Sequence, residues 1–228
     1  MTTVRSSATV GSQHDYWKDA KRFRAYDHTV VRFFARQRIE YLSEWLDWCD
    51  IKNALDVGCG SGISTYYMQE HIADLWAVDR SEDMLLRHPL RAKARVGIAD
   101  ALALPFESNS FDLVYGWEVL HHLADPRPAV AEMARVSRRY VLVAEPNRSN
   151  LLQCLFALMD REHRLVLRYT SAYLRGLLES AALEIERVGC GGWLFPNVTP
   201  PGLLTFLGRI PYRSPLGISN WILGRKKS

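Results

Sequence analysis

Residues 53–62 read NALDVGCGSG. The first five form a short, mostly apolar run typical of a buried β-strand, and glycines follow at Gly58, Gly60 and Gly62. Glycine lets a backbone turn tightly and approach a ligand, and a helix that begins after such a turn presents unpaired N–H groups. The dinucleotide fingerprint GxGxxG would need a third glycine where this chain has Ile63. The stretch therefore predicts a strand, a ligand loop and a helix, and it argues against NAD.

Short apolar runs alternate with helical stretches after this loop. Strands are predicted at LWAVD, ARVGIA, FDLVYG and YVLVAE, with helices beginning near residue 62, after Ser81 and at Pro128. EIERVG and NWILGRK predict two final strands, preceded by a helix that Thr170 or Ser171 can cap. Parallel strands joined by right-handed crossovers produce such alternation. We expect an α/β fold with a doubly wound, mostly parallel seven-stranded sheet.

A single domain is expected for the 228 residues. Residues 1–50 are predicted to be an N-terminal helical cover, because apolar residues between 13 and 50 lie near helical spacing. Residues 52–145 are predicted to be the ligand-binding core, and residues 146–228 a small cap region with the last strands. Within the cap, residues 150–168 favour helix, whereas residues 191–219, rich in Pro and Gly, follow no regular pattern.

Residues 54–62 resemble the first motif of class I S-adenosylmethionine-dependent methyltransferases, a family with a Rossmann-like sheet. Four further motifs follow in the family's order before residue 145, and they are AVDRS, the pair Asp100-Ala101, LPF with SFDLV, and GWEVLHH. The resemblance covers less than half of the chain. It implies an enzyme that binds S-adenosylmethionine, transfers its methyl group and releases S-adenosylhomocysteine.

The resemblance also implies where the cofactor is held. Asp79 would accept hydrogen bonds from both ribose hydroxyls, and Asp100 with Ala101 would contact the adenine. Arg80 stands where the family usually has an apolar residue, and its planar guanidinium can stack on the adenine ring. A second departure, Ala181-Ala182-Leu183 in place of Ala-Gly-Phe, removes a glycine helix cap. The expected cofactor-binding residues are Asp56, Gly58, Cys59, Gly60, Gly62, Asp79, Arg80, Asp100, Ala101, Gly116 and Trp117.

A base is needed only to remove a proton from an oxygen or nitrogen acceptor, because the sulfur leaving group is neutral. His121 is the first candidate for this base and Glu145 is the second, with a packed or solvent-facing pair with His122 as the alternative for His121. Asn147, next to Glu145 at the end of the fifth strand, is a candidate acceptor contact. Tyr16, Trp17 and Tyr26 are expected to cover the cofactor or acceptor, as this segment does in similar enzymes, or else to pack in the core.

Composition limits the other functions. The net charge is +4, and mixed charge in residues 1–50 argues against a nucleic-acid partner. The four cysteines show no metal-ligand spacing, so we expect reduced thiols and no metal. A signal peptide is not recognisable, and no apolar run reaches the ~18 residues of a membrane span. These features predict a cytoplasmic enzyme with a small-molecule acceptor, whose oligomeric state the sequence does not indicate.

The C-terminal part of the chain is basic and apolar together. After Glu186 there is no Asp or Glu, while six Arg or Lys residues follow. Either a buried last strand ends in exposed Arg225, Lys226 and Lys227, or the region makes contact with an anionic or membrane surface. The alternatives to a small-molecule acceptor are therefore a lipid-like or glycan-linked acceptor and, from another class, a non-catalytic cofactor-binding scaffold.

Overall fold

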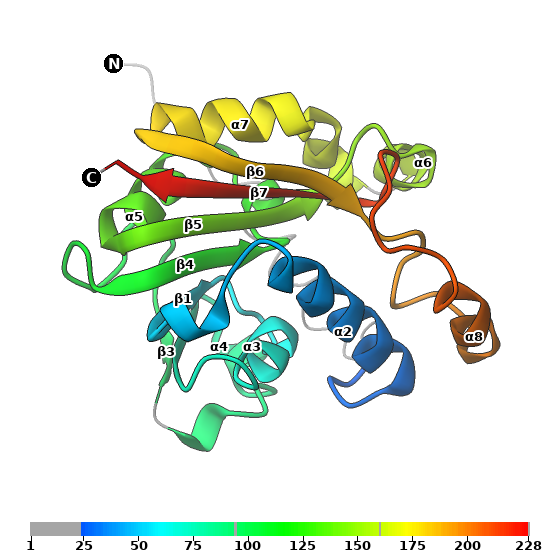
Figure 1. The fold of residues 1–228 in the computed structure, drawn as a ribbon, viewed down its shortest axis with the longest axis horizontal. Helices are drawn as coiled ribbons and strands as arrows, with labels where there is room; N and C mark the ends of the chain where they lie inside the picture. Colours follow the sequence, from blue (N-terminus) through cyan, green and yellow to red (C-terminus); the bar gives the residue numbers. More distant parts are fainter. Residues whose placement is uncertain (1–23, 94, 160, 228) are drawn as a thin grey trace, which may run out of the picture.

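A seven-stranded β-sheet forms the centre of the protein, as the sequence predicts (Figure 1). The computed structural model describes residues 24–227, apart from residues 94 and 160. The strands lie in the order β3-β2-β1-β4-β5-β7-β6. Their bounds are β1 Asn53–Val57, β2 Asp74–Asp79, β3 Val96–Ile98, β4 Phe111–Trp117, β5 Ser137–Pro146, β6 Leu183–Gly191 and β7 Ser219–Lys226.

Strand directions confirm a mostly parallel sheet. β1 to β5 pair in parallel, and β7 pairs antiparallel with both β5 and β6. The chain moves outward from β1 to β3, returns to the centre at β4, and then builds the other half of the sheet. β1 and β4 are therefore the neighbours at which the order reverses. Open α/β sheets bind ligands at the carboxyl ends of such strands.

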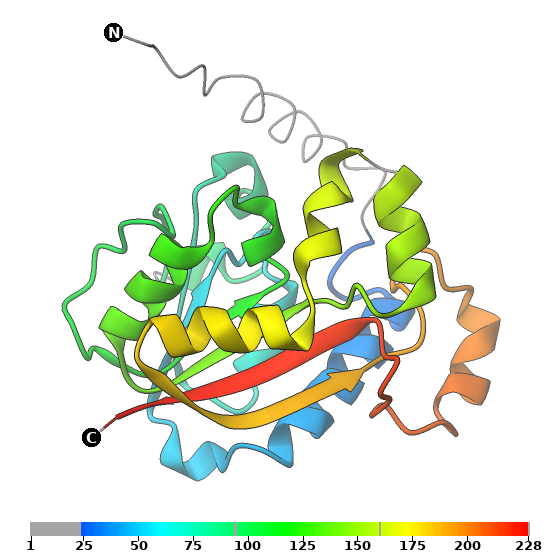
Figure 2. The same ribbon diagram turned by 90° about the horizontal axis from the view of Figure 1, so that it is seen from above.

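Helices cover both faces of the sheet, so it is doubly wound (Figures 1 and 2). The α-helices of the described residues are α2 Thr29–Ser43, α3 Ile63–Met68, α4 Glu82–Leu85, α5 Arg127–Val136, α6 Leu151–Met159, α7 Ser171–Ser180 and α8 Leu204–Leu207. α2 and α3 pack on one face, and α5 and α7 on the other. Successive strand residues point to opposite faces of the sheet. Leu113 lies in the core between the sheet and α2 and α3, and Val114 lies in the core between the sheet and α5 and α7.

Capping residues begin two helices where the sequence predicts. The Ser81 hydroxyl accepts from the N–H of Met84 at 3.3 Å, and the Thr170 hydroxyl accepts from the N–H of Tyr173 at 3.1 Å. The helical expectation for residues 13–50 is only partly confirmed. α2 and the 3-10 turn η2 (Trp48–Asp50) are helical, residues 24–28 are not, and residues 13–23 lie outside the described part.

The cap region leaves the sheet after β5 and again after β6. It contains α6, α8 and the 3-10 segments η5 (Arg161–Arg168) and η6 (Pro201–Leu203). Figure 2 shows α6 and α8 at the same end of the molecule. None of the helices within the described residues is both long and apolar enough to cross a bilayer.

The basic C-terminus differs from the expectation at one residue. β7 is buried through Gly224, and Arg225 and Lys227 are exposed. Lys226 is half-buried instead, because its Nζ donates to the carbonyl oxygens of Ala134 at 3.0 Å and Ser137 at 2.9 Å. This ammonium therefore satisfies carbonyl groups at the carboxyl end of α5, where the helix dipole favours a cation.

Candidate active site

The glycine loop lies at the point where the sheet order reverses. It follows β1, and Gly116 lies near the end of the neighbouring strand β4. Gly58, Gly60 and Gly62 have φ values of 73°, 53° and 80°. This left-handed region is one that side chains with a Cβ rarely adopt. The loop conformation therefore requires the glycines that the sequence places there.

Close packing around the loop is a second reason why glycine is required at two of these positions. A Cβ at Gly58 would lie 2.2 Å from Val119 Cγ2, and one at Gly62 would lie 2.4 Å from the His88 ring. At Gly60 a Cβ would meet only Met84 Cε, at 3.3 Å. The loop is thus packed tightly at both ends and open in the middle, which suits close approach of a ligand to the backbone.

Asp79 closes the loop from the end of β2. Its Oδ2 accepts the N–H of Gly60 at 2.8 Å, and its Oδ1 accepts the N–H of Ser81 at 2.8 Å. Each carboxylate oxygen can accept a second hydrogen bond. The carboxylate is therefore held rigidly beside the loop with capacity left for hydroxyl donors.

The other two acidic positions differ in exposure. Asp100, after β3, is exposed, and its Oδ1 accepts the N–H of Leu102 at 2.9 Å. Arg80 is exposed and Ala101 is half-buried, at the same edge of the sheet. Asp56 is fully buried, and its Oδ2 accepts the hydroxyls of Ser64 at 2.6 Å and Thr65 at 2.7 Å. Asp56 therefore anchors the start of α3 rather than facing a ligand.

Burial changes the protonation behaviour behind the loop. It raises the pKa of Asp56 from 3.8 to about 6, although the hydroxyls of Ser64 and Thr65 oppose the shift. His88 Nε2 lies 3.1 Å from the Thr65 hydroxyl, and burial lowers the pKa of His88 to about 4. The support of the loop is thus a chain of buried polar groups. At pH 7 His88 is neutral, and this pH is only slightly above the pKa of Asp56.

Comparison with known proteins identifies residues 55–143 as a methyltransferase domain. The chain is 36% identical over 95 residues to the chloroplastic tocopherol O-methyltransferase of Arabidopsis thaliana, covering 38% of this chain and 27% of that protein. It is 32% identical over 146 residues to the ubiquinone biosynthesis O-methyltransferase of Aromatoleum aromaticum, covering 57% of this chain and 62% of the relative. A crystal structure of an S-adenosylmethionine-dependent methyltransferase from Thermotoga maritima matches with a TM-score of 0.67 at 17% identity, covering 95% of this chain and 96% of that one.

Residues 55–143 therefore belong to the methyltransferase domain family, and the fold is that of solved S-adenosylmethionine-dependent methyltransferases. The matched domain contains the glycine loop, Asp79, Asp100 and the end of β4. The matched segments cover less than two thirds of the length of these curated relatives. Within the described residues, no group of three or more His, Cys, Asp or Glu side chains is placed to hold a metal ion.

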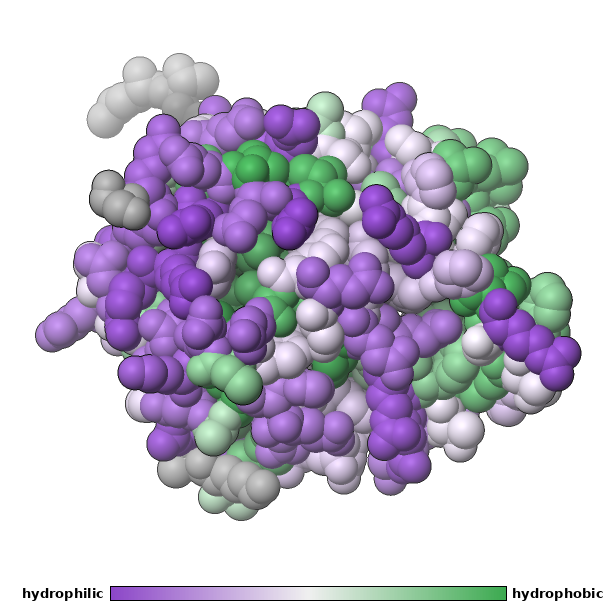
Figure 3. Space-filling model, viewed as in Figure 1, coloured by the Kyte–Doolittle hydropathy of each residue, from purple (hydrophilic) through white to green (hydrophobic). Residues whose placement is uncertain are grey.

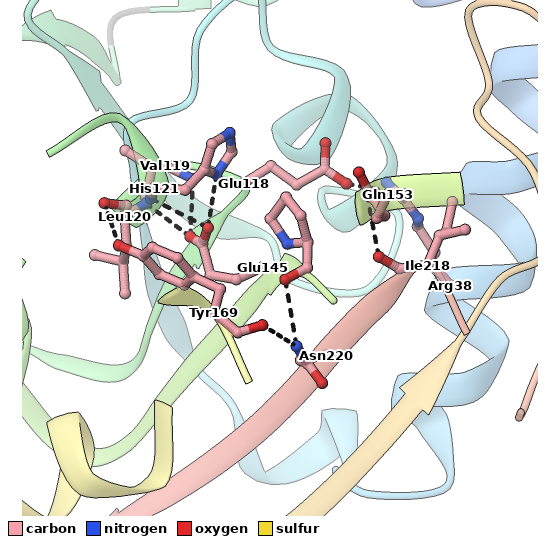
Figure 4. Close-up of polar contacts among 11 residues, drawn as sticks. Arg38, Glu118, Val119, Leu120, His121, Glu145, Gln153, Tyr169, Ile218 and Asn220 are labelled. Atoms are coloured by element: carbon pink, nitrogen blue, oxygen red, sulfur yellow. Dashed lines mark hydrogen bonds and ion pairs between the residues drawn. The ribbon is translucent and has the colours of Figure 1, made fainter. Parts of the chain in front are cut away.

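The protein has an ion pair at the end of β4. Glu118 adopts a left-handed backbone with φ of 60°, and its N–H donates to the carbonyl of Ala144 at 2.7 Å. Its Oε1 accepts from Arg38 Nη2 at 3.0 Å, and the Arg38 guanidinium lies 5.1 Å from the centre of the Trp117 ring. Buried Arg38 on α2 therefore holds the turn that carries Gly116 and Trp117 (Figure 4).

Glu145 holds the next turn of the chain, the 3-10 helix η4 (Leu120–His122). Its carboxylate is completely buried, with Oε1 accepting the N–H of Val119 at 3.0 Å and of Leu120 at 2.7 Å. Oε2 accepts the N–H of His121 at 3.3 Å and contacts His121 Nδ1 at 2.7 Å (Figure 4). Glu145 thus orients His121, and both side chains are buried, with 3% of His121 exposed.

Tyr169 supports the same turn from the cap. Its hydroxyl donates to the carbonyl of Leu120 at 2.6 Å, and its ring lies 6.3 Å from that of His121. Its own carbonyl accepts from Asn220 Nδ2 at 3.3 Å (Figure 4). The imidazole of His121 is therefore fixed by groups from β5 and from the segment before α7.

The remaining predicted site residues lie at the edges of this site. Asn147 is buried, and its Nδ2 donates to the carbonyl of Gly217 at 2.9 Å, so it joins two cap segments. Tyr26 is half-buried, with its ring 4.5 Å from that of Tyr66 and its carbonyl accepting the Tyr67 hydroxyl at 2.8 Å. Tyr16 and Trp17 lie outside the described residues.

Sequence reasoning missed three positioning residues of this site. Arg38 pairs with a residue 80 positions away, His88 packs under Gly62, and Tyr169 holds η4. Nothing in the local pattern distinguishes Arg38 or His88 from other polar residues near a helix. Tyr169 directly precedes the cap residue Thr170, which gives only its location.

Proposed function

We propose that this methyltransferase moves the methyl group of S-adenosylmethionine to an oxygen or nitrogen atom of a small-molecule acceptor. The observation that carries the proposal is the arrangement at the carboxyl ends of β1, β2, β4 and β5. There the open glycine loop with the Asp79 carboxylate adjoins the oriented pair His121–Glu145. The first part suits a nucleoside, and the second suits removal of a proton.

The residues present fit the cofactor. The Gly58–Gly62 backbone and Asp79 would hold its ribose and methionine ends, with Asp100, Ala101 and Arg80 at the adenine. When bound, S-adenosylmethionine supplies an electrophilic methyl group on a positively charged sulfur. The backbone at Gly116 and Trp117 would hold the amino-acid end.

His121 is the base in this proposal. A carboxylate that already accepts three backbone N–H groups acts as an acceptor toward the ring as well, so Nδ1 carries the proton. Nε2 is then the nitrogen that takes the acceptor's proton as the new bond to carbon forms. Glu145 keeps the ring in this tautomer and orientation, which is a positioning role rather than direct contact.

Oxygen is favoured as the methylated atom because the tocopherol and ubiquinone-biosynthesis relatives are named O-methyltransferases. A phenolic or enolic hydroxyl ionises more readily than an alcohol, so a single imidazole can deprotonate it. Nitrogen remains the alternative, and a panel of phenols and amines separates the two.

Calorimetric titration with S-adenosylmethionine and S-adenosylhomocysteine tests the cofactor half of the proposal. We expect the wild-type protein to bind both at micromolar order, and Asp79→Ala to lose at least about tenfold in affinity because it removes charge-assisted hydrogen bonds. Asp125→Ala removes an exposed carboxylate that pairs with Arg127, so it is the control. Absence of binding by the wild-type protein would refute the cofactor assignment.

Removal of the His121 imidazole should slow methyl transfer and leave cofactor binding unchanged. With an acceptor found in the phenol and amine panel, His121→Asn should lower the transfer rate by about 10²–10⁴-fold, the usual contribution of general base catalysis. Affinity for S-adenosylhomocysteine should stay within about twofold, because the imidazole contacts the acceptor in this proposal. An unchanged rate in His121→Asn would show that the acceptor loses its proton to another group.

A further inference from the structure

Helix α6 reverses the usual distribution of side chains on a surface helix, because a polar side chain is buried and the large apolar side chains are exposed. Its sequence, LLQCLFALM, contains no charged residue, yet its only buried members are Gln153 and Ala157. Gln153 Nε2 donates to the carbonyl of Ile218 at 3.1 Å, which explains why this polar side chain points inward. The large apolar side chains face outward, with Leu151 72% and Met159 86% exposed. Surface helices normally show the opposite distribution.

Other cap segments extend the apolar surface of α6. The ring of Phe156 is tilted against that of Phe195, with ring centres 5.6 Å apart, and the Asn150 side chain donates to the carbonyl of Leu216 at 2.6 Å. The exposed large apolar side chains of these segments are Leu151, Leu152, Leu155, Phe156, Leu158 and Met159 on α6, and Trp193, Val198, Leu203, Phe206 and Leu216. We call this set the cap surface.

Figure 3 shows apolar side chains gathered at the end of the molecule where Figure 1 places α6 and α8. Single exposed apolar residues are common on proteins, but a contiguous group on neighbouring segments indicates an interaction surface. Its location at the carboxyl end of β5 puts it beside the candidate active site.

The charges around the cap surface are positive. Arg148 precedes α6, and Arg209 and Arg213 flank the loop after α8; all three are exposed. Residues 147–159 and 192–218 contain no Asp or Glu. Directly after α6 the sequence has Asp160 and Glu162 together with Arg161 and Arg164. An apolar face with exposed arginines along its described border complements a surface that is apolar inside and anionic at its rim.

We propose that the cap surface docks the protein on the surface of an anionic lipid bilayer, with α6 lying in the interface and the arginines contacting lipid phosphates. A second copy is disfavoured, because a twofold pairing of this face would bring its arginine border against itself. The chain's own residues 1–23 are also a poor cover, since they contain four Arg or Lys against two Asp. The proposal rests on neither the cofactor nor methyl transfer.

Vesicle flotation of the full-length protein tests this docking. We expect association with vesicles of equimolar phosphatidylcholine and phosphatidylglycerol, weaker association with phosphatidylcholine alone, and loss of binding as salt rises. The double variant Leu151→Glu, Leu158→Glu places two carboxylates on the exposed face of α6, and its partition into vesicles should fall by at least about tenfold. Val188→Glu is the matched control, because Val188 is an exposed apolar residue on β6, outside the cap surface.

The outcomes separate the occupants of this face. Both variants must unfold at the wild-type temperature for the comparison to stand, and Arg209→Gln is a milder variant that should lower binding in the same direction. No association of the wild-type protein with anionic vesicles, or equal binding by the α6 double variant, would overturn the proposal. Dimers in sedimentation that the double variant dissociates, without vesicle binding, would assign the cap surface to a second copy.

Discussion

Asp56 belongs to the glycine-loop motif, but its side chain supports the loop from the protein interior. Its carboxylate is buried, bonded to two hydroxyls of α3, and has one oxygen without a hydrogen-bond partner. Burial therefore raises its pKa to about 6. A carboxylate held in this way fixes the loop geometry. Above pH 6 it is ionised while buried, which lowers the stability of the folded state.

Asp56→Asn should stabilise the protein at neutral pH. The folded pKa of about 6 lies above the unfolded value of 3.8, so the penalty for ionisation is present above pH 6 and disappears as pH falls through this range. At pH 7 the variant should gain up to roughly 3 kcal/mol in free energy of unfolding. The gain should shrink toward zero near pH 4.

Urea unfolding of both proteins between pH 4.5 and 7.5 measures this difference. His88 has its pKa lowered to about 4, so its own stabilising contribution is lost as pH falls below about 6.5. That contribution is common to both proteins and cancels in the difference. A gain that does not change with pH would show that Asp56 is not ionised through this range.

Glu145 contributes through hydrogen bonds, because both of its buried carboxylate oxygens contact groups of η4. Glu145→Gln replaces one acceptor oxygen by an NH₂ group that faces backbone N–H donors of η4. We expect a loss of about 2–4 kcal/mol in free energy of unfolding, since buried donors lose their partner. Urea denaturation measures it.

Glu132→Gln is the control for Glu145→Gln. Glu132 also accepts a backbone N–H, from Leu104 at 2.8 Å, and pairs with Arg135, but it is partly exposed. Glu132→Gln should lower the free energy of unfolding by less than about 1 kcal/mol, because solvent replaces the lost contacts. Equal losses in the two variants would mean that Glu145 does not hold η4 more firmly than a surface carboxylate would.

At the scale of elements, the carboxyl end of α7 carries a strained residue. Ala182 has φ of 61°, in the region where glycine commonly ends a helix. Ala182→Gly should raise the free energy of unfolding by about 0.5–1 kcal/mol, because the relieved strain exceeds the extra entropy that glycine gives the unfolded chain. Ala181→Gly is the matched control, because Ala181 has φ of −92° and should lose stability. A loss in both variants, measured by urea unfolding, would contradict this explanation.

Elements with a strong pattern could be predicted from sequence because their local and tertiary preferences agree. The run at 53–57 is apolar, is followed by glycines and forms β1 at those residues. Ser81 and Thr170 have side chains that cap helices wherever the backbone permits, and both helices begin there. The helix α6 is predicted as helix, but no local signal indicates that its apolar side faces outward.

At the scale of the whole molecule, the sheet brings together segments that the sequence keeps apart. The glycine loop, Asp79 and the end of β4 could be predicted because each directly follows a strand, and parallel strands end at one edge. The pair of Arg38 with Glu118 could not, because it depends on how α2 crosses the sheet. Such contacts between distant elements leave no periodicity or spacing in the sequence.

Ligand-linked stability tests whether this long-range pair belongs to the cofactor site. At 100 times its dissociation constant, S-adenosylhomocysteine should stabilise the wild-type protein by about 2.7 kcal/mol, which raises the unfolding temperature by roughly 5–10 °C for a chain of this size. Arg38→Met keeps the apolar stem but releases Glu118 and the turn at Trp117. At the same ligand concentration its thermal shift should fall to half or less.

Arg139→Met is the control for this measurement, because Arg139 pairs with Asp50 at 3.2 Å away from the glycine loop and should leave the shift unchanged. Comparing the shift with ligand, rather than the unfolding temperature itself, separates a role at the site from a role in packing α2 on the sheet. If Arg38→Met unfolds earlier but keeps the full shift, the pair stabilises the fold alone. A reduced shift confined to Arg38→Met would show that α2 helps to hold the cofactor from 80 residues away.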